Sequence, residues 1–219
     1  MTPALSKLNL TVHITSSVAW LGAVASFLAL SLAGLTSRDP ATAGSAYLAM
    51  NLIGQFIIVP LSLAALLTGF VQSVGTSWGL FRHYWVIVKL GLTIGATTLL
   101  LLHQFTAVRG AARRVLLAAA GTLPDVGPLG TQLVGDAGLA VLTLMAITVL
   151  GVYKPWGPTR YGRRKQQESR GMPIKTDSAR AVSGLPLGLR IFLAVVGLFV
   201  AGFALLHHAI SSGLGSHGH

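Results

Sequence analysis

Cysteine is absent from this sequence of 219 residues, and acidic residues are scarce. Without cysteine the chain has no disulfide, no thiolate metal site, no iron–sulfur ligand and no cysteine nucleophile. The chain has only 5 Asp and Glu residues. These are few for the paired carboxylates that acid–base hydrolysis uses, and few for the oxygen-rich sites that bind divalent metals. Any metal or cofactor therefore depends on histidine, lysine, methionine or these few carboxylates.

Charge is also scarce overall, because only 10% of the residues are charged, against about 25% in an ordinary soluble domain. Hydrophobic residues make up 53% of the chain, which indicates a membrane protein. The net charge of +11 would suit a nucleic-acid-binding protein, but such proteins lack long uncharged apolar runs. We therefore expect no nucleic acid as a partner and expect anionic lipid headgroups instead.

Five apolar segments are long enough to cross a bilayer as helices, which takes about 20 residues each. Strands are excluded at this length, because an open sheet in lipid leaves backbone groups without partners. The predicted fold is an all-α bundle of transmembrane helices in a single domain, residues 1–210. The five predicted spans are Leu10–Gly34, Ala46–Val74, Tyr84–Val108, Leu133–Tyr153 and Leu189–His208.

The distribution of basic residues predicts how these spans are oriented. One face of the membrane receives Lys7, Arg82, Lys154, Arg160, Arg163, Arg164, Lys165, Arg170, Lys175 and Arg180, with Arg190 at the start of the last span. The opposite face receives Arg38, Arg109, Arg113 and Arg114. Basic residues gather on the cytoplasmic side, so we expect a cytoplasmic N-terminus and an external C-terminus in the cell (inner or plasma) membrane.

The polar composition of two segments predicts that they lie outside the membrane. The loop of residues 154–188 mixes basic residues with Gly, Pro, Ser and Gln, and reads as a solvated linker at the anionic headgroups. The tail of residues 211–219 contains His217 and His219 and reads as a flexible terminus.

Ionisable residues within the spans are candidate functional groups, because their burial in lipid is costly. Counting along the helices separates them into two layers. The cytoplasmic layer contains His13, His83 and Lys89, and the outer layer contains His103, Asp136, His207 and His208. Since His83 and His103 are 20 residues apart, about 30 Å along one helix, a single haem or metal ion must use one layer.

Each of these residues also has a structural interpretation. His83, His207 and His208 lie at span ends, where polar residues are common at the membrane interface. The side chain of Lys89 is long enough to reach the cytoplasmic headgroups. Lys89 and His103 are 14 residues apart, which returns to one helix face, so the two side chains are also predicted to line one groove.

Three further positions are given structural roles, one in the shape of a helix and two in the packing between helices. Pro60 is expected to kink the second span. Gly91 and Gly95, four residues apart, are interpreted as notches where a neighbouring helix approaches.

The run from His13 to Gly22, with the pattern His-x6-Trp-x-Gly, resembles the first helix of a loose group of small bacterial membrane proteins. The group includes the copper-resistance D membrane domain, the membrane protoporphyrinogen oxidase of the four-helix type and actinobacterial families of unknown function. Trp85-x3-Lys89-Leu, His103 and Val152-Tyr-Lys-Pro155 are also similar, in the same order. The resemblance covers roughly residues 10–160.

The resemblance implies haem b as a cofactor, with His13, Lys89, His103 and Lys154 among the important positions. The sequence departs from the oxidase in its longer interval from Lys89 to His103 and in its predicted fifth span. It departs from the copper-handling relatives in having only 4 methionines, without a cluster.

Three functional hypotheses remain open at this point, and whether the protein is an enzyme is undecided. The first is a membrane protein that binds haem b or a similar redox cofactor between the first and third spans, through His13, Lys89, His83 and His103. The second is a metal-handling protein or small-solute permease of the copper-resistance D type, which accepts an ion through Asp136 and the metal ligands His103, His207 and His208. The third is a structural or assembly factor without a site.

Overall fold

A computed structural model describes residues 2–75, 83–119, 121–154 and 158–169 of the chain. These residues are helical almost throughout, which confirms the predicted all-α fold. The predicted fifth span at 189–208, with His207 and His208, lies outside the described residues. So do the tail 211–219 and most of the basic loop 154–188.

Four apolar helical stretches in the described part of the chain are long enough to cross a membrane. All four extend beyond the predicted spans at one or both ends, because the helices continue past the apolar stretches that the sequence marks. They are Pro3–Thr36, Pro40–Val74, Tyr84–Leu117 and Leu129–Tyr153.

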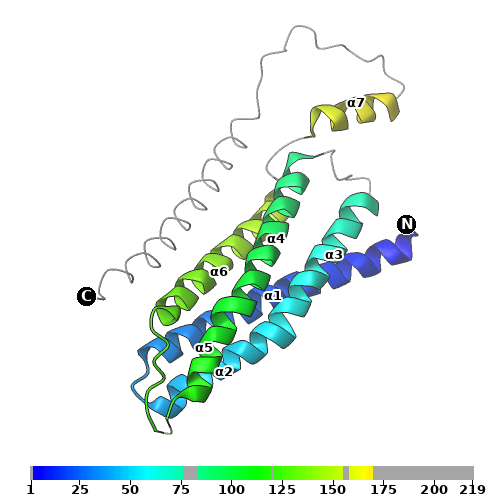
Figure 1. Cartoon of the computed structure of the whole chain (residues 1–219). Coiled ribbons are helices and arrows are strands. Elements are labelled where there is room, and N and C mark those ends of the chain that lie inside the picture. The colour runs from blue at the N-terminus through cyan, green and yellow to red at the C-terminus, as the bar shows by residue number, and fades with distance from the viewer. Residues whose placement is uncertain (1, 76–82, 120, 155–157, 170–219) are drawn as a thin grey trace, which may run out of the picture. The chain divides into compact units, whose positions relative to one another are not determined.

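The first unit of the chain comprises residues up to 80 and residues 86–153. At its centre is α1 (Pro3–Thr36), which packs closely on α2 (Pro40–Ile53), α3 (Val59–Gly75) and α6 (Leu129–Tyr153). Figure 1 shows α1 crossing behind the other helices of this unit. The largest buried side chains of the shared core include Trp20, Phe27, Tyr47, Met50, Ile58 and Leu133.

The helix starts follow from local capping chemistry. Pro3 and Pro40 each stand in the first turn, where the missing N–H of proline costs nothing. The Thr2 hydroxyl accepts from the backbone N–H of Leu5, and the Asp39 carboxylate accepts from the backbone N–H of Thr42. These caps supply acceptors to helix N–H groups that lack an intrahelical partner.

Two π-helical segments interrupt the longer helices. The segment η1 (Gly54–Ile58) joins α2 to α3, and the N–H of Val59 donates to the carbonyl of Gly54. Pro60 follows directly, and in a regular α-helix its ring would clash with the carbonyl four residues earlier. The wide turn before Pro60 is therefore where the helix adapts to the proline that the sequence singled out.

The segment η2 (Gln104–Val108) joins α4 (Tyr84–His103) to α5 (Arg109–Leu117). It packs against η1, and Gln104, which is 4% exposed, provides the polar contact. The Gln104 Nε2 donates to the backbone carbonyl and to Oδ1 of Asn51, each at 3.3 Å. Gly54 lies against the Gln104 side chain, where a larger residue would collide with it.

Glycines permit close packing at one end of the first unit. A Cβ on Gly34 would lie 2.9 Å from the Tyr47 ring, and one on Gly130 would lie 3.1 Å from the Tyr47 hydroxyl oxygen. The prediction that Gly91 and Gly95 are packing notches is wrong, because a Cβ on either would meet no atom within 4 Å. Small residues four apart mark one helix face, but they do not say whether that face meets a helix or lipid.

The second unit comprises residues 81–85 and residues from 154 onward. Its described part contains α7 (Arg160–Ser169) and an isolated β-bridge between His83 and Pro158. The Lys154 ammonium lies 5.9 Å from the centre of the Trp85 ring, a cation–π arrangement.

Candidate functional site: two ionisable pairs within the helices

His13 is held in one orientation by α3. Its Nδ1 lies 3.1 Å from the carbonyl oxygen of Ala65 and 3.1 Å from the Thr68 hydroxyl oxygen. The Thr68 hydroxyl donates its own hydrogen to the carbonyl of Ala64 at 2.6 Å, and a carbonyl can only accept. Both neighbours of Nδ1 are therefore acceptors, so Nδ1 carries the proton of the neutral ring.

This tautomer leaves Nε2 of His13 with a lone pair, which points at Lys89. The distance from Lys89 Nζ to His13 Nε2 is 3.4 Å, so the ammonium donates to the imidazole. Metal-binding histidines show the same pattern, in which one ring nitrogen donates to a backbone carbonyl and the other is a free ligand. The structure thus joins two of the predicted site residues through a nitrogen that is suited to coordination.

Glycines on two helices make room for this His13–Lys89 pair. A Cβ on Gly69 of α3 would lie 3.0 Å from Cε1 of His13. A Cβ on Gly151 of α6 would lie 3.2 Å from Lys89 Nζ. The pair is therefore set among α1, α3, α4 and α6, and both of its side chains are half-buried.

Lys89 has no carboxylate partner among the described residues. Each described acidic residue contacts another group instead. Asp39 caps α2, Asp125 accepts from the N–H of Gly127, Asp136 meets His103, and Glu168 pairs with Arg164. A half-buried lysine whose only described side-chain partner is a neutral imidazole suits a ligand that brings an acceptor or a negative charge.

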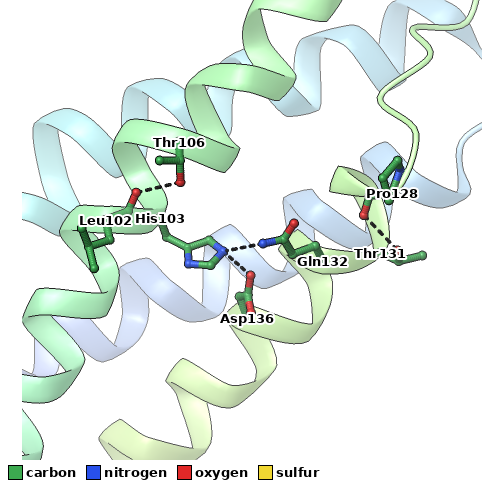
Figure 2. Close-up of polar contacts among 7 residues, drawn as sticks. All are labelled: Leu102, His103, Thr106, Pro128, Thr131, Gln132 and Asp136. Atoms are coloured by element: carbon green, nitrogen blue, oxygen red, sulfur yellow. Dashed lines mark hydrogen bonds and ion pairs between the residues drawn. The ribbon is translucent and has the colours of Figure 1, made fainter. Parts of the chain in front are cut away.

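The outer layer contains a second pair, formed by His103 of α4 and Asp136 of α6. Figure 2 shows the His103 ring pointing at α6, with its Nε2 between the Asp136 carboxylate and the Gln132 amide. Gln132 and Asp136 are four residues apart, on one face of α6. The His103 Nε2 lies 3.2 Å from Gln132 Nε2.

The proton arrangement of the His103–Asp136 pair has two forms. In one, Nε2 of His103 carries a hydrogen and donates it to Asp136. In the other, Nε2 accepts from the Gln132 amide and the carboxyl group holds the proton. The three side chains therefore share one set of hydrogen bonds between α4 and α6.

The two pairs lie far apart, so no single ion can join them. His103 follows Lys89 by 14 residues on α4, about 21 Å along the helix. His83 belongs to the second unit, where its ring centroid lies 6.4 Å from that of Trp85. Within the described residues no group of three or more His, Cys, Asp or Glu gathers as metal ligands.

Sequence reasoning missed several partners. Gln132 could have been found from its four-residue spacing to Asp136. Thr68 and the carbonyl of Ala65 gave no signal, because their role depends on how α3 is rotated against α1. Gln104 was also missed.

No protein-family model, no curated protein and no solved structure matches this chain.

Proposed function

We propose that this membrane protein binds a redox cofactor, haem b in the first instance, with Nε2 of His13 as its ligand. The observation that carries the proposal is the 3.1 Å contact between Nδ1 of His13 and the carbonyl of Ala65, because a hydrogen bond from Nδ1 leaves the lone pair on Nε2, away from α3. Histidine is the most common axial ligand of haem, and a single proximal histidine suffices in many haem proteins. The first-helix resemblance supports the same assignment.

The residues present supply one nitrogen, Nε2 of His13, that would hold the iron. Iron bound to Nε2 would replace the hydrogen bond from Lys89. Lys89 is then available to an anionic group of the cofactor, which suits a lysine without a described carboxylate partner. When bound, the cofactor would supply the electron chemistry, and His13 and Lys89 would hold it in place.

The absorption spectrum of the protein, purified in detergent after expression with ample haem, tests this proposal. We expect a Soret band in the wild type and in His103→Ala, and its loss in His13→Ala with the helical circular dichroism retained. A wild type without a Soret band contradicts the proposal.

Ion handling at the outer pair is a second candidate, favoured by the convergence of His103, Asp136 and Gln132 (Figure 2). It ranks second because two metal-ligating residues fall short of the three or four that zinc sites use. Equilibrium binding of zinc and copper to the wild type and to Asp136→Asn tests it, since specific binding must weaken in the variant. A protein that binds neither haem nor metal would retain the third role, that of a structural or assembly factor.

The proposed location is the cell membrane, with five spans, a cytoplasmic N-terminus and the basic loop at the anionic headgroups. The exposed Arg163 and Arg164 of α7 support the headgroup contact. Because the chain has no cysteine, a single introduced cysteine is a unique label. An impermeant maleimide added to intact cells should label Arg38→Cys and leave Ala4→Cys unlabelled, and the reverse pattern would contradict this orientation.

A further inference from the structure

The helix α5 carries basic and apolar side chains together on one exposed face. Leu116 and Leu117 follow Arg113 by three and four residues, so the three side chains share one side of the helix. Leu116 is 71% exposed, Leu117 is 86% exposed, and Arg113 is exposed as well. The other side of α5 meets the bundle, because Ala111 and Ala112 are buried. The face turned away from the bundle therefore combines positive charge with apolar surface.

Two close approaches place α5 at the end of the bundle where α2 and α6 begin. A Cβ on Gly44, near the start of α2, would lie 3.4 Å from Cγ1 of Val115. A Cβ on Gly110 would lie 3.5 Å from Cδ1 of Leu129, the first residue of α6. Figure 1 shows α5 beside α2 at this end of the first unit. In a membrane, the end of a bundle of spanning helices lies at the layer of the lipid headgroups.

Positive charge is concentrated on α5. Three of the four arginines predicted for this face of the membrane, Arg109, Arg113 and Arg114, belong to this one helix. Among the described side chains, no carboxylate forms an ion pair with Arg113 or Arg114. A Cβ on Gly127 would lie 3.2 Å from Nη1 of Arg114, but the Asp125 carboxylate nearby accepts from the N–H of Gly127. The two exposed guanidinium groups therefore suit an anion from outside the chain.

The leucines beside these arginines distinguish a phospholipid from a free anion. A free anion would leave both leucines exposed to water, whereas the acyl chains of a lipid cover them. Helices that lie at a membrane surface combine basic residues with leucine in this way. Arginine binds phosphate oxygens through two parallel hydrogen bonds, and a phospholipid offers the phosphate and the acyl chains in one molecule. A lipid with net negative charge complements the two arginines better than a zwitterionic lipid does.

From this arrangement we propose that α5 binds an anionic phospholipid of the surrounding membrane. Arg113 and Arg114 hold the phosphate group, and Leu116 and Leu117 lie against the acyl chains. Arg113 follows Lys89 by 24 residues along α4, η2 and α5, which is about 36 Å of helix. The lipid site is therefore separate from the proposed cofactor site, and either proposal can fail without the other.

Fluorescence quenching by brominated lipids tests the site. Because the chain has no cysteine, Ala119→Cys, at an exposed position just after α5, carries a single fluorescent label. The labelled protein is reconstituted in phosphatidylcholine vesicles that contain an equal fraction of either brominated phosphatidylglycerol or brominated phosphatidylcholine. We expect the binding constant from quenching to favour phosphatidylglycerol by about fivefold or more, the factor that one basic residue contributes near anionic lipid. This preference should shrink as salt screens the charges.

Arg113→Gln in the labelled protein should lose most of the preference, and Arg113→Gln with Arg114→Gln should bind the two lipids equally. Arg38→Gln is the matched control, because it removes one exposed arginine from the loop between α1 and α2 on the same predicted face of the membrane. It should retain the preference of the parent protein. Equal quenching by the two lipids in the parent protein would overturn the proposal, and this comparison needs no arginine variant. A preference that survives in the double variant, or that Arg38→Gln loses as strongly as Arg113→Gln, would also overturn it.

Discussion

The ammonium nitrogen of Lys89 lies 3.4 Å from Nε2 of His13, on the side of the ring opposite the nitrogen that α3 holds. The two nitrogens are directly hydrogen-bonded to each other. If His13 holds haem iron as proposed, Lys89 would be the neighbour of the ligand and not a second ligand.

Replacement of Lys89 by methionine tests this distinction. Because His13 alone is assigned as the ligand, Lys89→Met should retain a Soret band at the wild-type position. The measurement is the absorption spectrum of the purified variant at equal protein concentration. If the band disappears or moves as strongly as in His13→Ala, Lys89 is itself an axial ligand and the assignment is incorrect.

Gly69→Ala should disturb His13 directly. The added methyl group would stand 3.0 Å from Cε1 of a ring that two acceptors hold in place, so the ring must shift. We expect a lower haem content per protein than in the wild type, measured by absorbance. Gly95→Ala is the control, since its methyl group meets nothing within 4 Å and should leave haem content unchanged. Equal haem content in the two variants would show that the His13 position does not matter.

Gly34→Ala should destabilise the bundle where α1 meets α2. Its methyl group would lie 2.9 Å from the ring of Tyr47, which is 2% exposed and has no room to move. Overpacking of this kind costs about 1–3 kcal/mol. Thermal unfolding in detergent should show a lower midpoint for Gly34→Ala.

Gly22→Ala, on the same helix, is the control for that experiment. Its methyl group meets no atom within 4 Å, and alanine favours helix over glycine by roughly 0.5–1 kcal/mol. Its midpoint should equal or exceed that of the wild type. A Gly34→Ala protein as stable as Gly22→Ala would contradict the described packing at Tyr47.

Asp39 should make stability depend on pH through the cap of α2. Hydrogen bonds from the hydroxyl and the backbone N–H of Thr42 lower the pKa of the exposed Asp39 carboxyl below its ordinary value. A lowered folded-state pKa stabilises the protein above the unfolded-state pKa of about 4, and the gain is lost as pH falls through the folded-state value.

The comparison variant is Asp39→Asn, which retains a capping side chain without a titratable group. The difference in unfolding midpoint between wild type and Asp39→Asn should be constant near pH 7 and shift against the wild type as pH drops below about 4. A difference that stays the same down to pH 3 would exclude the contribution of this cap.

The sequence predicts the helical membrane fold well, because long apolar runs without charge admit few other structures. Counting residues along the spans also placed His13 and Lys89 at one depth, and the structure shows them in contact. The depth of a residue along its span does not reveal, however, how the helix is rotated about its own axis. The contacts of His13 with Thr68 and of His103 with Gln132 depend on which faces the helices turn toward each other.

The two π-helical segments also show that the sequence does not reveal contacts between helices. Pro60 marks where the second long helix must adapt, but no sequence signal indicated the matching turn at Gln104–Val108. That turn pairs with the first through Gln104 and Asn51, so it arises from contact between two helices and not from either one alone. Gly91 and Gly95 were misassigned for the related reason that spacing identifies a face without its surroundings.

Haem titration of the purified apoprotein tests the central claim most directly. Haem b is added stepwise to the wild type and to His13→Ala, and the Soret absorbance is followed to saturation. The account predicts that the wild type saturates at one haem per chain and that His13→Ala shows only the weak, unsaturated rise of haem in detergent. Identical titration curves for the two proteins would contradict the assignment of His13 as the ligand.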